Sequence, residues 1–246
     1  MIILFSPSEA KALHNSDSFD LFNLPFNDKL SSLRNSIFEK YNAILQADDK
    51  TLCMHSGLSK AEELKELRDA PMDLGLCALY RYSGVAYKYL SAQTLDKNAI
   101  AFLNNHLLIF SNLFGPIFAN SVIPYYKLKQ GQSLDGFKVE VAYKPLLNPL
   151  LDAKFENEFV LDLRAGFYEK FYSPKIPYAT MQFYKNGKKM SHWAKAHRGK
   201  VVRTLAQNRP NNQSEFESIS FEGLHVKEIL RQKHATHYCF DILDAL

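Results

Sequence analysis

The stretch Ile2–Lys11, IILFSPSEAK, joins a strand pattern to a polar loop, and it decides how the rest of the chain is interpreted. The run Ile2–Phe5 is short, apolar and partly β-branched, and a Ser-Pro pair interrupts it, so we predict a buried strand that ends in a loop. In open α/β sheets, loops at the carboxyl ends of strands line the ligand crevice. Ser8, Glu9 and Lys11 would place a hydroxyl, a carboxylate and an ammonium group there. The same residues also fit an ordinary helix start, with Ser8 as the cap.

Helical and strand-like patterns alternate along the remaining sequence. Apolar positions at helical spacing predict a helix around Leu33–Leu45, and a second one over about Ala194–Asn208. Two further buried strands are expected within His106–Pro116 and Glu158–Tyr168, and Asn-Gly between β-prone runs predicts a hairpin within Tyr178–Trp193. We therefore expect an α/β (α+β) fold, with residues 1–246 forming a single domain whose mixed sheet is flanked by helices.

The composition is that of a globular protein in a reducing compartment. Of the 246 residues, 46% are hydrophobic and 23% are charged, and the three cysteines (Cys53, Cys77 and Cys239) are scattered and odd in number. The N-terminus has no cationic leader, and no apolar run approaches the ~20 residues that a membrane span needs. We expect a cytoplasmic protein with no membrane partner.

Positive charge is concentrated in one segment. Between Glu169 and Glu215 there are ten Lys and Arg residues and no acid, so this segment has a formal charge of +10. The whole chain has a net charge of +4, so the remaining residues together carry −6. Such segregation points to an anionic partner. On the helix 194–208, Lys195 and Arg198 fall inside the apolar stripe, whereas Arg203 falls outside it.

Burying Lys195 and Arg198 without anionic partners would be costly. Either they form ion pairs with buried carboxylates such as Asp162, or they line a cleft that receives an anion. Gly199 lies between them and indicates that something approaches this helix closely, since glycine in a helix costs ~1 kcal/mol relative to alanine.

Residues of about 48–68 predict two short helices joined by a turn, with Asp48 or Asp49 capping the first helix and Ser59 the second. The turn MHSGLSK resembles a helix-hairpin-helix element, which points backbone amides at a DNA phosphate. In it, Gly57 would provide the turn and Lys60 a phosphate contact. A glycine-containing helix connection is also common without any such role.

Two other clusters favour structural interpretations. The tyrosines of YRYSGVAYKYL (80–90) can stack on bases beside Arg81 and Lys88, but core packing is the more usual use of such residues. His234, His237 and Cys239 lack a fourth ligand nearby and suit a terminal strand, so we expect no metal site. The sequence has no Walker loop, Rossmann fingerprint or CxxC pair, and we expect no cofactor.

Six motifs, SPSEAK, YSGVAY, SNLFG, IPYYKL, DLRAGFY and AKAHRG…R, occur in an order and spacing that resembles the YaaA family of peroxide-stress resistance proteins. The resemblance covers Ile2 to about Asn208. It implies a cytoplasmic α/β protein with a helix-hairpin-helix element and a basic cleft that binds DNA, linked to hydrogen peroxide protection and intracellular iron control. The family's recurrent polar positions correspond to Ser8, Glu9, Lys11, Tyr87, Lys127, Asp162, Arg164, Lys195, Arg198 and Arg203.

Three hypotheses for these basic residues follow, two functional and one structural. In the first, the chain binds DNA without regard to sequence, through Lys11, Lys127, Lys195, Arg198 and Arg203 in a positive cleft and through the hairpin. In the second, the same groups with a carboxylate form an enzyme pocket for a small phosphorylated or carboxylated substrate. In the third, the cations are purely structural.

Overall fold

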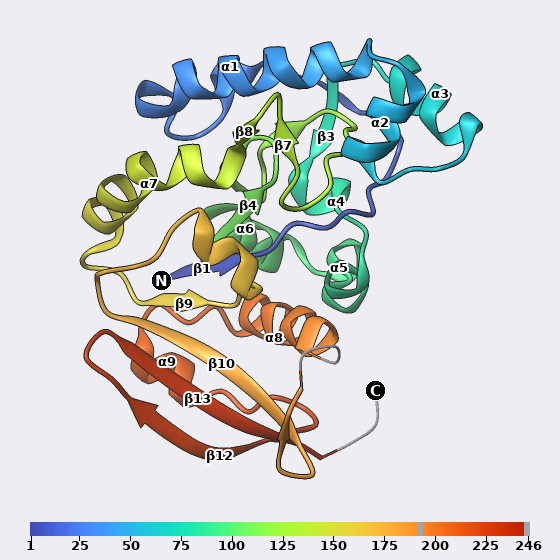
Figure 1. Cartoon of the computed structure of the whole chain (residues 1–246). Helices are drawn as coiled ribbons and strands as arrows, with labels where there is room; N and C mark the ends of the chain where they lie inside the picture. The colour runs from blue at the N-terminus through green and yellow to red at the C-terminus, as the bar shows by residue number, and fades with distance from the viewer. Residues whose placement is uncertain (191–193, 244–246) are drawn as a thin grey trace.

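The computed structural model describes residues 1–190 and 194–243, and within them a mixed sheet of eight strands forms the centre of the molecule (Figure 1). Its strands are β1 (Ile2–Phe5), β4 (Leu107–Ser111), β5 (Gly115–Phe118), β9 (Val160–Asp162), β10 (Tyr178–Lys185), β11 (Lys188–Lys189), β12 (Leu224–Arg231) and β13 (Ala235–Ile242).

The strands lie in the order β12-β13-β10-β9-β1-β4-β5, and β11 pairs with β10. The inner strands β13, β10, β9, β1 and β4 run parallel, whereas β12 and β5 pair antiparallel at the two edges. All residues of β1, β4 and β9 are buried, which explains their continuous apolar runs in the sequence. The expected mixed sheet is therefore confirmed.

Strand β1 is the point at which the strand order reverses. The chain passes from β1 to β4 on one side, and later returns to β9 on the other side. In sheets of this kind the crevice outside the carboxyl ends of the strands at the reversal is where ligands bind. The loops that follow β1 and β9 meet there: the backbone N–H of Leu163 donates to Leu4 O, and that of Ala165 donates to Ser6 Oγ.

Helices flank the sheet, and small sheets join the outer segments. The helices are α1 (Asn27–Leu45), α2 (Asp49–Ser56), α3 (Ala61–Asp69), α4 (Ala78–Arg81), α5 (Val85–Leu90), α6 (Lys97–His106), α7 (Val139–Phe155), α8 (Ala194–Asn208) and α9 (Gln213–Glu217), with short 3₁₀ turns η1 (Leu21–Asn23), η2 (Ala92–Thr94) and η3 (Gly166–Lys170). The small strands are β2 (Asp17–Ser18), β3 (Leu74–Cys77), β6 (Val122–Ile123), β7 (Ser133–Leu134) and β8 (Phe137–Lys138). No helix among the described residues is both long and apolar enough to cross a bilayer.

Several local predictions can be compared with the structure. The β10–β11 hairpin turns at Asn186-Gly187 with φ of 51° and 75°, as a two-residue turn of this sequence requires; its predicted end, Ser191–Trp193, lies outside the described residues. Helix α8 has the predicted bounds, and Asp48 caps α2 by accepting from Thr51 N. The Ser59 cap was wrong: α3 begins after Lys60 and has no side-chain cap.

Helix α8 packs against α5, α6 and β10 (Figure 1). Gly199 makes the contact with α5 possible, because a Cβ there would lie 2.0 Å from the carbonyl oxygen of Ala86. The close approach expected at Gly199 is thus made by the protein's own backbone. This contact fixes where Lys195 and Arg198, on the same helix, stand relative to the loop after β1.

We predict that Gly199→Ala destabilises the protein by ~2 kcal/mol or more, because overpacking outweighs the ~1 kcal/mol that alanine contributes to a helix. Urea denaturation measures the change. Gly166→Ala is the matched control, since the nearest atom to its added Cβ is the flexible Glu169 carboxylate at 3.7 Å. Equal stability of the two variants would contradict this packing account.

His197 lies on the packed side of α8, 2% exposed and stacked on Phe183 with ring centroids 5.4 Å apart. Neither ring nitrogen has a hydrogen-bond partner among the described residues. Burial, with repulsion from Lys200 and Lys185, lowers the pKa of His197 from 6.5 to about 4. The folded protein therefore resists protonation of this ring.

Because the unfolded chain binds the His197 proton at higher pH than the folded chain does, the free energy of unfolding must fall as pH drops from about 6.5 toward 4. We predict a loss of ~2 kcal/mol from this group between pH 7 and pH 5. Denaturation of the His197→Phe variant should lack this part of the pH dependence, whereas the exposed control His14→Phe should keep it. An unchanged slope in His197→Phe would contradict the assignment.

Candidate functional site

A large concavity among the described residues opens at the carboxyl ends of β1 and β9. It consists of two cavities of about 610 and 350 Å³ that share Ala165, Lys195 and Arg198 in their walls. The larger cavity extends along β10 to Lys189 and the η3 turn, and the smaller one lies between the loop after β1 and the start of α5. We call the two together the α8 cleft.

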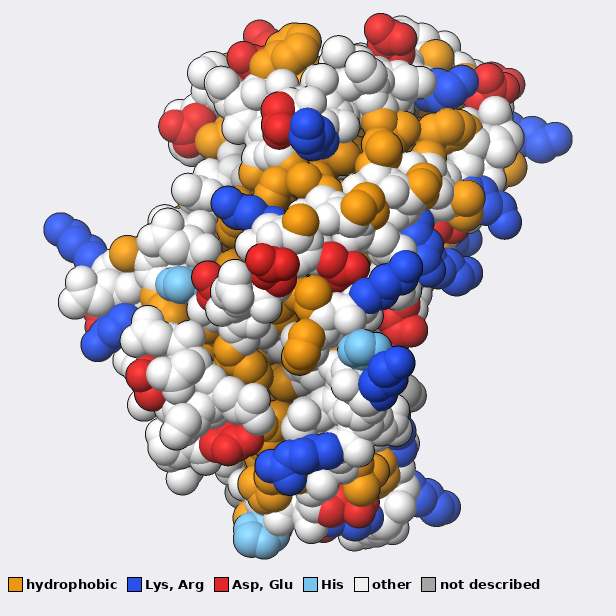
Figure 2. All heavy atoms as spheres, turned by 90° about the vertical axis from the view of Figure 1, so that its left-hand side faces the viewer, with side chains coloured by type: hydrophobic (Ala, Val, Ile, Leu, Met, Phe, Trp, Pro, Cys, Tyr) orange, Lys and Arg blue, Asp and Glu red, His pale blue; other side chains and the backbone are white. Residues whose placement is uncertain are grey.

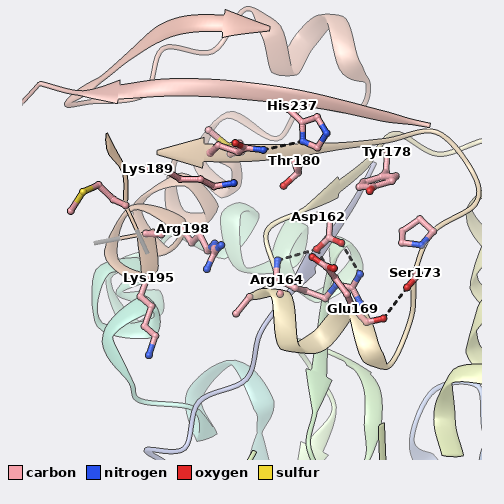
Figure 3. Close-up of a pocket in the computed structure, with 17 residues that line it drawn as sticks. Asp162, Arg164, Glu169, Ser173, Tyr178, Thr180, Lys189, Lys195, Arg198 and His237 are labelled. Atoms are coloured by element: carbon pink, nitrogen blue, oxygen red, sulfur yellow. Dashed lines mark hydrogen bonds and ion pairs between the residues drawn. The ribbon is translucent and has the colours of Figure 1, made fainter. Parts of the chain in front are cut away.

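Asp162 and Arg164 form one wall of the larger cavity (Figure 3). The Arg164 guanidinium donates to both carboxylate oxygens of Asp162, from Nε at 2.9 Å and from Nη2 at 2.6 Å. It also donates to the carbonyls of Tyr168 and Tyr172, and lies over the Phe110 ring. Arg164 is thus a buried structural cation, and its charge is already matched by Asp162.

Lys195 and Arg198 have no such match. In residues 1–190 and 194–243 neither side chain forms an ion pair with an acid. Burial lowers the pKa of the Arg198 guanidinium, while the nearby Asp162 charge acts in the opposite direction. Arginine keeps its proton in proteins, so the half-buried charge of Arg198 remains and carries a desolvation cost. An anion in the cleft would offset that cost.

Figure 3 shows how these groups are directed. Arg198 and Lys189 point into the larger cavity toward the Asp162–Arg164 pair, and Lys195 points away from Lys189. Among the described residues neither Lys195 nor Arg198 lies within ion-pair distance of Asp162, although the Asp162 charge still acts on Arg198. Lys195 is exposed in the cleft, although the helical spacing placed it on the inward stripe.

Lys11 lies behind the loop after β1 and not among the residues that line the α8 cleft. It is 9% exposed, its ammonium lies 4.1 Å from the centre of the Tyr126 ring, and it donates to Ser8 O. Burial lowers the pKa of Lys11 well below its usual value, and the neighbouring Lys127 charge lowers it further. Lys127 donates to Glu9 O. These two lysines hold the loop whose Ser8 and Glu9 line the smaller cavity.

Arg203 also lies outside the α8 cleft. Its guanidinium donates to the carbonyls of Leu90 and Ser91 and to Thr94 Oγ1, so it satisfies the C-terminal end of α5. The residue is therefore structural in this geometry. Helical spacing correctly separated Arg203 from Lys195 and Arg198, but it could not reveal this partner.

The turn between α2 and α3 contributes no residue to the walls of the α8 cleft. Gly57 adopts φ of 76° and packs against the side chain of Lys129, whose backbone N–H donates to His55 O. Lys60 is exposed. Helix α3, however, carries the acids Glu62, Glu63, Glu66 and Asp69. A DNA strand bound at this turn would therefore lie beside the positive charge of Lys60 and the negative charges of α3.

The face of the molecule in Figure 2 does not carry charge of one sign. On the face in Figure 2, acidic and basic side chains are interspersed, and Lys and Arg side chains gather along its right-hand margin. The described residues contain no cluster of three or more His, Cys, Asp or Glu side chains that could hold a metal ion. The α8 cleft remains the strongest candidate site.

Several lining residues did not stand out in the sequence. Lys189 belongs to the recognised hairpin, and its β10 partner strand brings it to the cleft. Tyr178, Thr180, Gln182 and His237 line the cleft because alternate residues of β10 and β13 share one sheet face. The sequence could show that alternate residues of these strands share one face. It could not show the strand order, which brings this face to the same cavity as Arg198.

Comparison of the sequence with known proteins identifies the family of this chain. The model of the family described as peroxide stress protein YaaA matches residues 1–230. An uncharacterized protein of Campylobacter jejuni is 38% identical over 99% of this chain and 100% of its own length. A UPF0246 protein of Corynebacterium glutamicum is 31% identical, with 93% of this chain and 95% of the relative covered. The chain belongs to the YaaA family of peroxide stress proteins.

Proposed function

We propose that this member of the YaaA family binds DNA through its phosphates, without reading base sequence, as part of protection against hydrogen peroxide. The observation that carries the proposal is the pair Lys195 and Arg198: both line one cleft, and neither has an acidic partner within the described residues. Arg198 is partly desolvated, so an incoming phosphate would face less competition from water than at an exposed side chain.

Three further features support an anionic partner. Lys189 lines the same cleft from β11. The first residues of α8 lie at the cleft, and the N-terminal end of a helix carries partial positive charge. The segment between Glu169 and Glu215 contributes +10, so the surrounding potential favours a polyanion. Control of intracellular iron, which the family resemblance also implies, stays a prediction.

An enzyme acting on a small phosphorylated or carboxylated substrate is the second candidate. Glu169 lines the same cavity as Arg198 and Lys189, so a carboxylate is available as acid or base beside the cations. Arg198 and Lys189 point into this cavity together (Figure 3). A purely structural role fits Arg164 and Arg203, whose partners are described above, but it does not fit Lys195 and Arg198.

We predict that Lys195→Ala combined with Arg198→Ala weakens binding of a short duplex uniformly across sequences. Each lost phosphate contact should reduce the slope of log affinity against log salt by ~0.9, so the double variant should lose ~2 units of slope. Fluorescence anisotropy at several salt concentrations provides the measurement. The matched control, Lys97→Ala with Lys154→Ala, removes the same charge from exposed positions outside the cleft.

Equal loss of affinity in the control would show that only net charge matters, which would contradict a defined site. Absence of duplex binding by the wild-type protein at low salt would end the DNA proposal. Unchanged duplex binding by the double variant, with loss of peroxide protection in cells, would favour the enzyme. Loss of stability alone would favour a structural role.

The hairpin contributes a separate prediction. If the turn at Gly57 contacts a phosphate, Lys60→Ala should lower the salt slope by ~1. The loss of slope in Lys60→Ala should add to the loss in the cleft variants, since no residue of the turn lines the α8 cleft. The control is Lys65→Ala on α3. A slope equal to that of wild type in Lys60→Ala would remove the hairpin from the interface and leave the cleft.

A further inference from the structure

The smaller cavity of the α8 cleft has a composition that phosphate binding alone does not explain. Its walls are largely apolar and aromatic, formed by Phe5, Pro7, Val85, Tyr87, Leu163 and Tyr168. At about 350 Å³ it falls in the ~300–1,000 Å³ range typical of cavities that take small organic ligands. A groove that held only the sugar-phosphate backbone would have no use for this apolar volume.

The cavity is preformed by fixed contacts between the loop after β1 and the start of α5. The Tyr87 hydroxyl donates to Ser6 O at 2.9 Å. A Cβ on Gly84 would lie 2.1 Å from Ser8 Oγ, so only glycine lets these two segments approach so closely. Ala165 N donates to Ser6 Oγ on the opposite side. The walls therefore stand in place before any ligand arrives.

Polar side chains also line the smaller cavity, and they lie at defined places. Lys195 and Arg198 stand at the junction with the larger cavity. Ser8, Glu9 and Gln130 also line the smaller cavity, and they offer a hydroxyl, a carboxylate and an amide. A matching ligand has an anionic group at one end and an apolar, planar body with hydrogen-bonding edges at the other. A nucleoside phosphate has this composition.

We infer that the α8 cleft binds one nucleoside phosphate unit, with its base in the smaller cavity and its phosphate against Lys195 and Arg198. This inference rests on the proposed DNA binding for the source of the nucleotide: a base turned out of the duplex, as in enzymes that extrude nucleotides into a protein cavity. A free mononucleotide offers the same chemistry, and the experiment distinguishes the two sources.

The test uses Val85→Phe. Val85 is 49% exposed at the start of α5 and lines the smaller cavity, so a phenyl ring there occupies the space for the base without disturbing the core. The control is Val141→Phe on α7, 59% exposed and outside the cleft. Thermal denaturation confirms that both variants fold.

The first probe is a duplex with a single unpaired 2-aminopurine, whose fluorescence rises when the base leaves the stack. Wild type and Val141→Phe should raise it. Val85→Phe should not, when the variants are compared at equal amounts of bound duplex, measured by anisotropy. The second probe is AMP, followed by calorimetry. Val85→Phe should weaken AMP binding by about tenfold or more, because the phenyl ring fills the space that the base would occupy.

A 2-aminopurine signal that Val85→Phe abolishes supports the inference with DNA as the source. AMP binding that Val85→Phe and Lys195→Ala both weaken, without a 2-aminopurine signal, supports it with a free nucleotide as the source. If the wild-type protein binds duplex but neither probe responds, or if Val85→Phe responds to both probes as wild type does, the inference is overturned while DNA binding stands. Failure of duplex binding would instead overturn the proposed function, and AMP would still decide the cavity's role.

Discussion

The ion pair between Asp162 and Arg164 sets the charge of the whole cleft. Both carboxylate oxygens of Asp162 accept from the Arg164 guanidinium, and Asp162 Oδ1 also accepts from the Arg164 backbone N–H. The acid whose charge acts on Arg198 is therefore already paired with another cation. Had Asp162 been available to Arg198, α8 would present a neutralised surface. As it stands, Arg198 and Lys195 enter the cleft as charges without acidic partners among the described residues.

The fold places these charges where a ligand can reach them. The strand order reverses at β1, so the loops after β1 and β9 diverge around one crevice. Two close approaches then set its walls: Gly199 lets α8 contact the backbone of α5, and Gly84, just before α5, lets the side chain of Ser8 in the loop after β1 lie against it. A chain of contacts thus runs from the buried centre of the sheet to Arg198. The position of α8, more than the composition of the surface, gives the cleft its shape and its positive charge.

Much of this fold could be predicted from local patterns, and the failures have physical causes. The buried strands, the Asn-Gly hairpin and α8 were readable because each depends on residues adjacent in sequence. Helix α7 was not predicted, since Pro145 and Pro149 lie inside it. Both prolines are exposed four residues apart, so the carbonyls they leave unpaired lie on the outer side of the helix. The chain tolerates them because water can satisfy those carbonyls.

Part of the candidate site could be predicted from the sequence for a similar reason. Spacing on one helix separated Lys195 and Arg198 from Arg203, and the structure gives these groups different surroundings. Spacing could not show that Lys11 is buried against Tyr126, that Arg164 already has a partner, or that Arg203 satisfies the end of α5. Each of those outcomes depends on a residue more than thirty positions away or on the local fold of a loop. The apolar cavity beside Val85 likewise appears only when β1, α5 and β9 come together.

The most direct test follows the arginine side chains themselves. The Nε–Hε signals of Arg198, Arg164 and Arg203 can be assigned by substitution and followed by NMR while a short duplex is added at low salt. We expect the Arg198 signal to shift and saturate with the duplex, whereas those of Arg164 and Arg203 stay near their free positions. An unmoved Arg198 signal at saturating DNA would contradict the claim that its charge is the anion-binding centre of the cleft.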